Sequence, residues 1–319
     1  MTGRFRSLLA GDLDRFLEFK RALGHPYRGS EYILRSFDRF IHEHAPRRGP
    51  IAFDDLVRRW LAQRSGRKAV SVTNNLAPVR QFFLFRCRSH PGGFVPGRVF
   101  APQATESVFI PHVFSPAEVR TLLDAAARLK GPSFYSHTIR TLLLVLYCTG
   151  VRFGEALRLR LCDVDLRRRL FVVHESKGKT RFVPFREDLA RKLRSYQSKR
   201  DRTAAASTMT FFVRVSGRPY SVADASAIVR RLLRRTGLKP ERGRIGPRPY
   251  DFRATFAVHR LTRWYRSGAD LTRRLPWLST YMGHVNLLGT EVYLTATPEL
   301  IAIAGRKLRA RLAQGGITR

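Results

Sequence analysis

The sequence predicts a mainly α-helical protein with a small antiparallel β-sheet, divided into two domains. Apolar residues recur with helical spacing through most of its 319 residues. Three short segments of β-type composition interrupt this pattern near the middle of the chain. Residues 93–113 are rich in proline and glycine and have no helical period, which indicates an extended linker between the domains.

The first domain, residues 1–92, is expected to contain four helices. Gly24 and Pro26 end the first helix, and Ser30 is placed to cap the second, with Glu31 in its first turn. Gly66 closes the third helix. The four predicted helices are 8–23, 30–44, 53–64 and 71–88.

The second domain, residues 114–319, is expected to combine helices with the sheet. Ser115, Pro116 and Glu118 supply an N-cap, a first-turn proline and a favourable charge for its first helix. The predicted strands are 160–165, 170–175 and 180–185, and the sequence SKGK makes the turn between the last two a basic hairpin tip. The predicted helices are 116–129, 138–148, 187–202, 222–235, 251–265, 271–282 and a last one from 298.

The charge of the chain predicts a polyanionic partner. Sixty Lys and Arg against 24 Asp and Glu give a net charge of +36, far more than solubility requires. The charge is spread along segments with ordinary hydrophobic periodicity, so it belongs to folded basic surfaces of the kind that bind nucleic acid. A ribosomal or chromatin protein from a genome of high GC content has the same composition, and composition alone leaves that alternative open.

No cofactor or metal is expected from the cysteines. Cys87, Cys148 and Cys162 are odd in number and lack CxxC spacing, so they indicate neither a disulfide framework nor a zinc site. The sequence has no apolar run near the ~20 residues of a membrane span, and its start lacks a signal-peptide pattern. We expect a cytoplasmic, nucleoid-associated protein.

Four separated segments together contain the groups that phosphoryl transfer requires: TGVRFGE at 149–155, SKGKTRFVPF at 176–185, YDFRATFA at 250–257 and YMGHVNLLGTEVYL at 281–294. The reaction requires a nucleophile, positive donors for the non-bridging oxygens and an acid for the leaving oxygen. Arg152 has a fork suited to two phosphate oxygens, and Glu155, one helical turn on, is placed to orient it. Taken alone, this Arg and Glu are more typical of a surface ion pair than of a phosphate site.

Lys177 at the hairpin tip is the candidate acid, because a flexible ammonium there can reach a departing 5′ oxygen. Lys179 and Arg181 are then expected to contact backbone phosphates, although Lys179 is also a candidate for the acid role. A basic hairpin tip of this kind is also typical of a solvated turn. Arg253, at the start of a predicted helix, is placed to reach a second phosphate oxygen.

His284 and Tyr293 complete the set. His284 follows Gly283 at the end of an amphipathic helix, and Tyr293 lies nine residues further on, between Val292 and Leu294. A lone histidine at this position is more often structural, and Tyr293 could equally be a core residue, so their assignment depends on the other segments.

These motifs, in combination and in order, resemble those of the tyrosine recombinases, also called phage integrases. TGVRFGEALRL resembles the first arginine box of that family, and YMGH with a tyrosine at the ninth position after the histidine resembles its nucleophile box. The resemblance spans nearly the whole chain and implies a helical core-binding domain of SAM-like fold, followed by an α+β catalytic domain. It further implies that the last helix docks on a neighbouring subunit, although a self-packing terminal helix is an equal alternative.

The resemblance also implies roles for single residues. Arg152 and Arg253 would bind the scissile phosphate, Lys177 would be the general acid, His284 would support the phosphate, and Tyr293 would be the nucleophile. The reaction would pass through a 3′-phosphotyrosyl link on double-stranded DNA, within a homo- or hetero-tetramer, and would need no metal or ATP.

One position departs from the family pattern. The second box usually begins with His or Lys three residues before its arginine, whereas Tyr250 stands there in this chain. A phenol is a poor base at neutral pH but can donate a hydrogen bond to phosphate. Two alternatives to an active recombinase therefore stay open: a catalytically weak DNA-binding accessory protein, and a nicking and resealing enzyme like the type IB topoisomerases.

Overall fold

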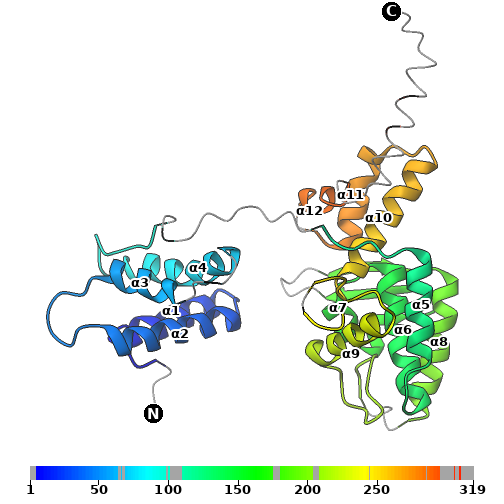
Figure 1. Ribbon diagram of the computed structural model, residues 1–319, viewed down its shortest axis with the longest axis horizontal. Coiled ribbons are helices and arrows are strands. Elements are labelled where there is room, and N and C mark those ends of the chain that lie inside the picture. Colours follow the sequence, from blue (N-terminus) through cyan, green and yellow to red (C-terminus); the bar gives the residue numbers. More distant parts are fainter. Residues whose placement is uncertain are drawn as a thin grey trace, which may run out of the picture. The chain divides into compact units, whose positions relative to one another are not determined.

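A computed structural model of the chain describes residues 5–63, 66, 69–97, 100, 110–174, 180–203, 208–243, 245–284, 286–294, 305 and 309. The chain divides into two compact units, Met1–Phe109 and Ile110–Arg319 (Figure 1). Most described residues are helical, and the strands form one three-stranded antiparallel sheet within the described part of the chain. The predicted fold class is confirmed.

Unit 1 is a four-helix domain with an aromatic core. Its helices are α1 (Ala10–Ala22), α2 (Arg28–His44), α3 (Phe53–Ala62) and α4 (Ala69–Arg86). Phe37 and Trp60 pack edge to face with ring centroids 5.1 Å apart, and both are fully buried. The predicted cap at Ser30 is wrong, because α2 begins at Arg28. Tyr27 adopts a left-handed conformation before it and packs its ring against Phe16, so tertiary packing decides where the helix begins.

Aromatic packing continues past the last helix of unit 1. Phe94 lies against Phe83 with ring centroids 5.2 Å apart, and Phe100 lies against Phe94 at 5.9 Å. We expected both rings within the extended linker, but burial of their apolar area holds them on the core of unit 1. Residues 98, 99 and 101–109 lie outside the described residues.

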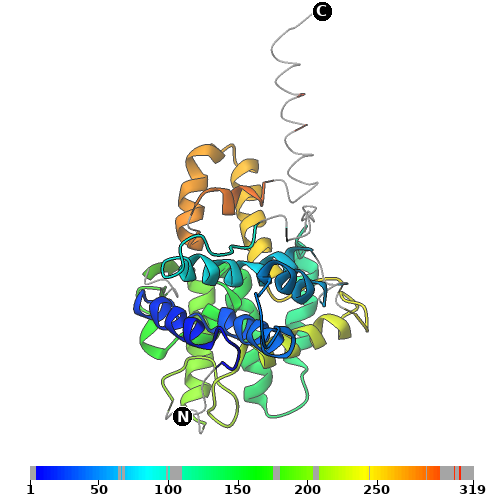
Figure 2. The same cartoon turned by 90° about the vertical axis from the view of Figure 1, so that its left-hand side faces the viewer.

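Unit 2 is built around α6, which packs against α5, α8 and α10 (Figures 1 and 2). The predicted N-terminus of α5 is confirmed, since Ser115 and Glu118 form a capping box. The helices of unit 2 are α5 (Pro116–Ala127), α6 (Ser133–Thr149), α7 (Phe153–Arg158), α8 (Glu187–Asp201), α9 (Val222–Arg235), α10 (Asp251–Arg266), α11 (Leu271–Met282) and α12 (Leu288–Glu291).

The sheet has the order β1 (Val164–Asp165), β2 (Leu170–His174) and β3 (Thr180–Pro184). Phe171 of β2 pairs with Val183 of β3, and both side chains are buried in the main core of unit 2. The first strand is shorter than predicted. A 3-10 turn, Leu161–Asp163, precedes it because the Asp163 carboxylate accepts the backbone N–H of Arg160 at 2.9 Å. The hairpin tip, 175–179, lies outside the described residues.

Two short helices, α7 and α12, were not predicted. They have six and four residues, too few to show a helical period in the sequence. A second core cluster of unit 2 joins α10 and α11 with Tyr293, which follows α12. The predicted helix from 298 falls almost entirely on residues that are not described. Within the described part of the chain, no helix is both long and apolar enough to span a membrane.

Candidate active site

The turn between α6 and α7 places Arg152. Gly150 ends α6 in the left-handed conformation with φ +62°, and a Cβ at this position would lie 2.5 Å from the ring of Phe256. Only glycine fits both requirements. The chain then enters α7 at once, with Arg152 as its N-cap residue, and the backbone N–H of Arg152 donates to the Glu155 carboxylate at 2.8 Å.

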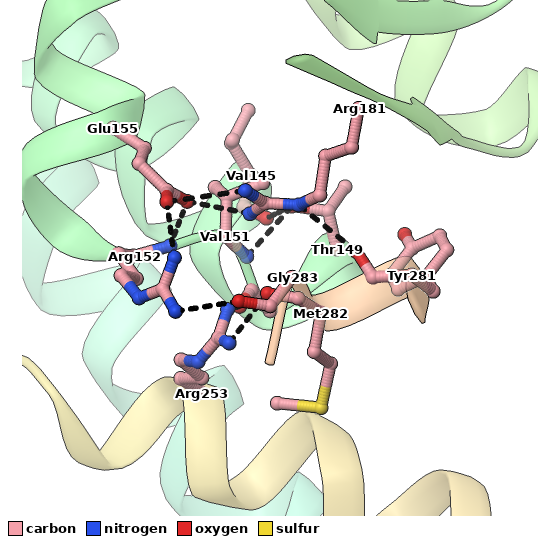
Figure 3. Close-up of polar contacts among 11 residues, drawn as sticks. Val145, Thr149, Val151, Arg152, Glu155, Arg181, Arg253, Tyr281, Met282 and Gly283 are labelled. Atoms are coloured by element: carbon pink, nitrogen blue, oxygen red, sulfur yellow. Dashed lines mark hydrogen bonds and ion pairs between the residues drawn. The ribbon is translucent and has the colours of Figure 1, made fainter. Parts of the chain in front are cut away.

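Backbone carbonyls at helix ends hold the two predicted phosphate-binding arginines (Figure 3). Nη2 of Arg152 donates to the Gly283 carbonyl at 2.8 Å. Nη1 of Arg253 donates to the Gly150 carbonyl at 2.8 Å, and its Nη2 donates to the Met282 carbonyl at 2.6 Å. The last carbonyls of a helix have no partner within that helix, so the ends of α6 and α11 are natural acceptors for these guanidinium groups.

Arg253 is a buried cation, and one of its N–H donors has no acceptor among the described residues. Its side chain lies on α10 and is 2% exposed. Its Nε is buried and has no hydrogen-bond partner among the described residues. Burial and the neighbouring charge of Arg152 lower the pKa of Arg253. A buried donor without an acceptor costs about 1–3 kcal/mol, so this arrangement favours binding of an anion at Arg253.

Glu155 is shared by two arginines. Its carboxylate accepts from Nη1 of Arg152 at 2.7 Å and from both terminal nitrogens of Arg181, at 3.2 and 2.7 Å. Burial alone would raise the pKa of Glu155, but the hydrogen bonds from Arg181 and Arg152 bring it below its ordinary value. Glu155 is therefore ionised at neutral pH.

The end of α11 positions His284. Gly283 is left-handed with φ +70°, and the backbone N–H of His284 donates a hydrogen bond to the Ser279 carbonyl at 3.0 Å. The imidazole Nδ1 lies 2.6 Å from the hydroxyl of Thr290, a fully buried residue of α12. Burial, followed by the charges of Arg253, Arg152 and Arg181, lowers the pKa of His284 to about 4. The imidazole is therefore neutral at physiological pH.

Tyr293 lies two residues beyond the end of α12 and is 5% exposed. Burial raises the pKa of its phenol, while the positive charges of Arg253 and Arg152 lower it in part. Its ring centroid is 6.2 Å from that of His284. The phenol is thus kept protonated beside the cations that would assist its ionisation.

Tyr250 precedes α10 and is 47% exposed. It interacts electrostatically with Arg253 and Tyr293, so it lies at the same site. Its exposure leaves the phenol accessible to a ligand.

The structure brings together seven of the nine residues that the sequence singled out: Arg152, Glu155, Arg181, Tyr250, Arg253, His284 and Tyr293. Lys177 and Lys179 lie outside the described residues. Arg181 is placed differently from the expectation, because its side chain turns inward to Glu155 and is only 9% exposed. Sequence reasoning missed Thr290. Among the described residues, no group of His, Cys, Asp and Glu is arranged to hold a metal ion.

The family comparison decides the class of this protein. The model of the phage integrase family matches residues 112–299, more than half of the chain, including every predicted site residue. The chain belongs to the phage integrase family. Among its relatives is the tyrosine recombinase XerC of Lacticaseibacillus casei, 30% identical over 59% of each chain, and this chain is a tyrosine recombinase.

Known relatives of this phage integrase family member match it over most of its length. A putative integrase/recombinase of Sinorhizobium fredii, y4rB, is 31% identical over 94% of this chain and 96% of its own. The solved XerH site-specific recombinase, bound to its palindromic difH substrate, shares the fold with a TM-score of 0.68 at 15% identity, over 86% of this chain and 78% of that one. A lambda integrase tetramer bound to a Holliday junction matches with a TM-score of 0.60 at 17% identity, over 89% and 79%.

Proposed function

We propose that this protein is a site-specific recombinase that cleaves and rejoins double-stranded DNA through a covalent link to Tyr293. The observation that carries the proposal is the convergence of Arg152, Arg253, His284 and Tyr293 from three separate segments of the chain. An ionisable nucleophile beside a buried, partly unpaired cation suits attack on a phosphodiester.

The cations and the imidazole would bind the phosphate. Arg152 and Arg253 donate to its non-bridging oxygens, where negative charge grows in the transition state. The unpaired Nε–H of Arg253 is one such donor. His284 is neutral, so it adds a hydrogen bond without adding charge. Tyr250 would donate a further hydrogen bond from its exposed phenol.

The strand-transfer steps conserve the number of phosphodiester bonds and use no cofactor. The Tyr293 oxygen attacks phosphorus, its proton leaves to a neighbouring base or water, and the bond to the 5′ oxygen breaks as Lys177 protonates that oxygen. A 3′-phosphotyrosyl link and a free 5′ hydroxyl result. The 5′ hydroxyl of a partner strand then attacks the phosphotyrosine and releases Tyr293, so the number of phosphodiester bonds is conserved.

Unit 1 would serve as the core-binding domain for DNA. Arg28, Tyr32, Arg35 and Arg39 are all exposed and recur at positions that share one face of α2. Lysine or arginine with interleaved aromatic residues is typical of a nucleic-acid surface. Exchange between two duplexes requires two cleavages on each, so the active assembly would be a homo- or hetero-tetramer. Its DNA would be the nucleoid DNA of the cytoplasm.

A nicked suicide substrate tests the nucleophile. Loss of the short strand beyond the cleavage site prevents religation, so the wild-type protein should accumulate a covalent adduct with DNA that carries its true site. Tyr293→Phe should form none while it keeps its DNA affinity. Equal trapping by both proteins would show that Tyr293 is not the nucleophile.

The same material separates recombination from the alternatives. A recombinase should exchange label between two duplexes that carry the site. Relaxation of supercoiled DNA without exchange would instead indicate nicking and resealing. Binding without any adduct would indicate an accessory protein, the alternative that Tyr250 supports.

A further inference from the structure

Arg181 of β3 is enclosed within the protein, beside the residues proposed to bind phosphate. Its side chain is 9% exposed, and the Glu155 side chain that it meets is 4% exposed. Strand residues two positions apart point to the same face of a sheet, and Val183, two positions beyond Arg181, is buried. The strand therefore directs Arg181 inward.

Hydrogen bonds to described residues join Arg181 to two other segments (Figure 3). Its Nη1 and Nη2 donate to the two carboxylate oxygens of Glu155 at 3.2 and 2.7 Å, which is a bidentate pair. Its Nε donates to the Tyr281 carbonyl at 3.1 Å. One planar group thus links β3 to the start of α7 and to the last turn of α11.

Both of those segments carry the proposed phosphate-binding residues. Glu155 also binds the side chain and backbone of Arg152. The residues after Tyr281 supply the Met282 and Gly283 carbonyls that hold Arg253 and Arg152. Loss of Arg181 would leave Glu155 with Arg152 as its remaining arginine partner and would remove one hydrogen bond from the end of α11, and both changes would alter the direction in which Arg152 points.

We propose that Arg181 is a positioning residue for strand cleavage: it fixes Glu155 and the end of α11 so that Arg152 faces the scissile phosphate. This inference rests on the proposed function. It differs from the role expected from the hairpin sequence, in which Arg181 contacts a DNA phosphate itself.

Matched charge variants distinguish the two roles. Arg181→Met removes the cation, Arg181→Lys keeps the charge but loses the fork, and Arg186→Met removes a cation from a nearby site whose side chain is 77% exposed. For each protein, DNA affinity at several salt concentrations and the rate of adduct formation on the suicide substrate are measured. Thermal unfolding establishes that each variant is folded.

A positioning role predicts a split between binding and cleavage. Arg181→Met should bind DNA as Arg186→Met does, with the same salt dependence, yet form the adduct on the order of 100-fold more slowly, since small misplacements of a positioned group can cost that much. Arg181→Lys should not restore the rate, because a compact ammonium lacks the planar fork that pairs with the carboxylate while Nε bonds the Tyr281 carbonyl. Glu155→Gln combined with Arg181→Met should be little slower than the slower single variant.

Two results would overturn the inference. Adduct formation at the wild-type rate by Arg181→Lys would show that the fork is not needed. A weaker affinity of Arg181→Met, with a salt slope reduced by about one relative to Arg186→Met, would identify Arg181 as a phosphate ligand. If Arg181→Met does not fold, Arg181→Lys and Arg181→Gln decide the question. Failure of the wild-type protein to form a Tyr293 adduct would instead contradict the proposed function.

Discussion

Arg253 and Tyr250 illustrate how two donors at one site can differ in strength. Arg253 is charged, buried and held by two carbonyls, whereas Tyr250 is neutral and half exposed. A charged donor in a buried site stabilises developing negative charge more strongly than a neutral donor in contact with water.

Replacement of these donors should reveal that difference. Tyr250→Phe should slow adduct formation by at most about tenfold, the loss of one neutral hydrogen bond. Arg152→Ala and Arg253→Ala should each slow it by about 100-fold or more. Single-turnover cleavage of the suicide substrate measures all three rates. Complete loss of cleavage in Tyr250→Phe would mean that the phenol has an essential role beyond hydrogen bonding.

His284 should resist protonation in mildly acidic solution. Its pKa of about 4 is below the ordinary value of 6.5, because burial and three arginine charges disfavour the imidazolium. The unfolded chain therefore takes up this proton first as the pH falls. The contribution of His284 to stability is fully present above 6.5 and is lost as the pH falls toward 4. NMR titration of the imidazole, assigned with His284→Gln, measures this pKa, and a midpoint near the ordinary value would contradict the burial of the charge.

Arg181 and Thr290 show what residue-level sequence reasoning could and could not detect. The alternation of β3 contained the signal for Arg181, since Arg181 shares a strand face with apolar Val183. The basic residues around it favoured a surface position instead. Thr290 gave no such signal, because its contact with His284 depends on the position of α12. The roles of Lys177 and Lys179 stay predictions.

At the scale of elements, the junction between α6 and α10 depends on a glycine. Gly150 is left-handed and lies against Phe256, while its carbonyl accepts from Arg253. The close approach of the two helices is therefore coupled to the position of the buried arginine.

Gly150→Ala should destabilise the protein by about 2–4 kcal/mol, the sum of left-handed strain and steric overlap with Phe256. Gly237→Ala is the matched control, because Gly237 is also left-handed but has open space where a Cβ would lie. Its cost should be about 1 kcal/mol. Urea unfolding measures both, and equal losses would show that the contact with Phe256 contributes nothing.

The longer elements were accessible from sequence, and the short ones were not. Helices such as α8 and α9 span enough turns for an apolar face to recur, and their predicted bounds agree closely with the structure. By contrast, α7 is less than two turns long, and α12 is about one turn long. Their positions follow from caps and tertiary contacts that local periodicity does not contain.

At the scale of the whole molecule, the net charge of +36 predicts strong salt dependence of DNA binding. Each phosphate that a Lys or Arg neutralises releases a condensed counterion. With about six such contacts, affinity should fall about 1,000-fold between about 50 and 200 mM salt. Fluorescence anisotropy with a labelled duplex measures the slope. A flat response would contradict a DNA surface built from these basic residues.

The chain divides into two compact units, and the composition of the sequence changes after α4. Sequence predicted the architecture because hydrophobic periodicity, caps and turn residues act locally. It could not predict that aromatic rings at Phe94 and Phe100 would join the core of unit 1, since that packing depends on partners distant in the chain.

Because backbone carbonyls hold Arg152 and Arg253, substitutions and insertions at the helix ends should affect this site differently. They belong to the backbone, so replacement of the side chain at Met282 need not alter the acceptor that Arg253 uses. Insertion of one residue into α11 would, however, rotate its final peptide groups by about 100° and aim those acceptors elsewhere. The geometry of the site therefore depends on the lengths of α6 and α11. Substitutions at the ends of these helices should be better tolerated than insertions or deletions within them.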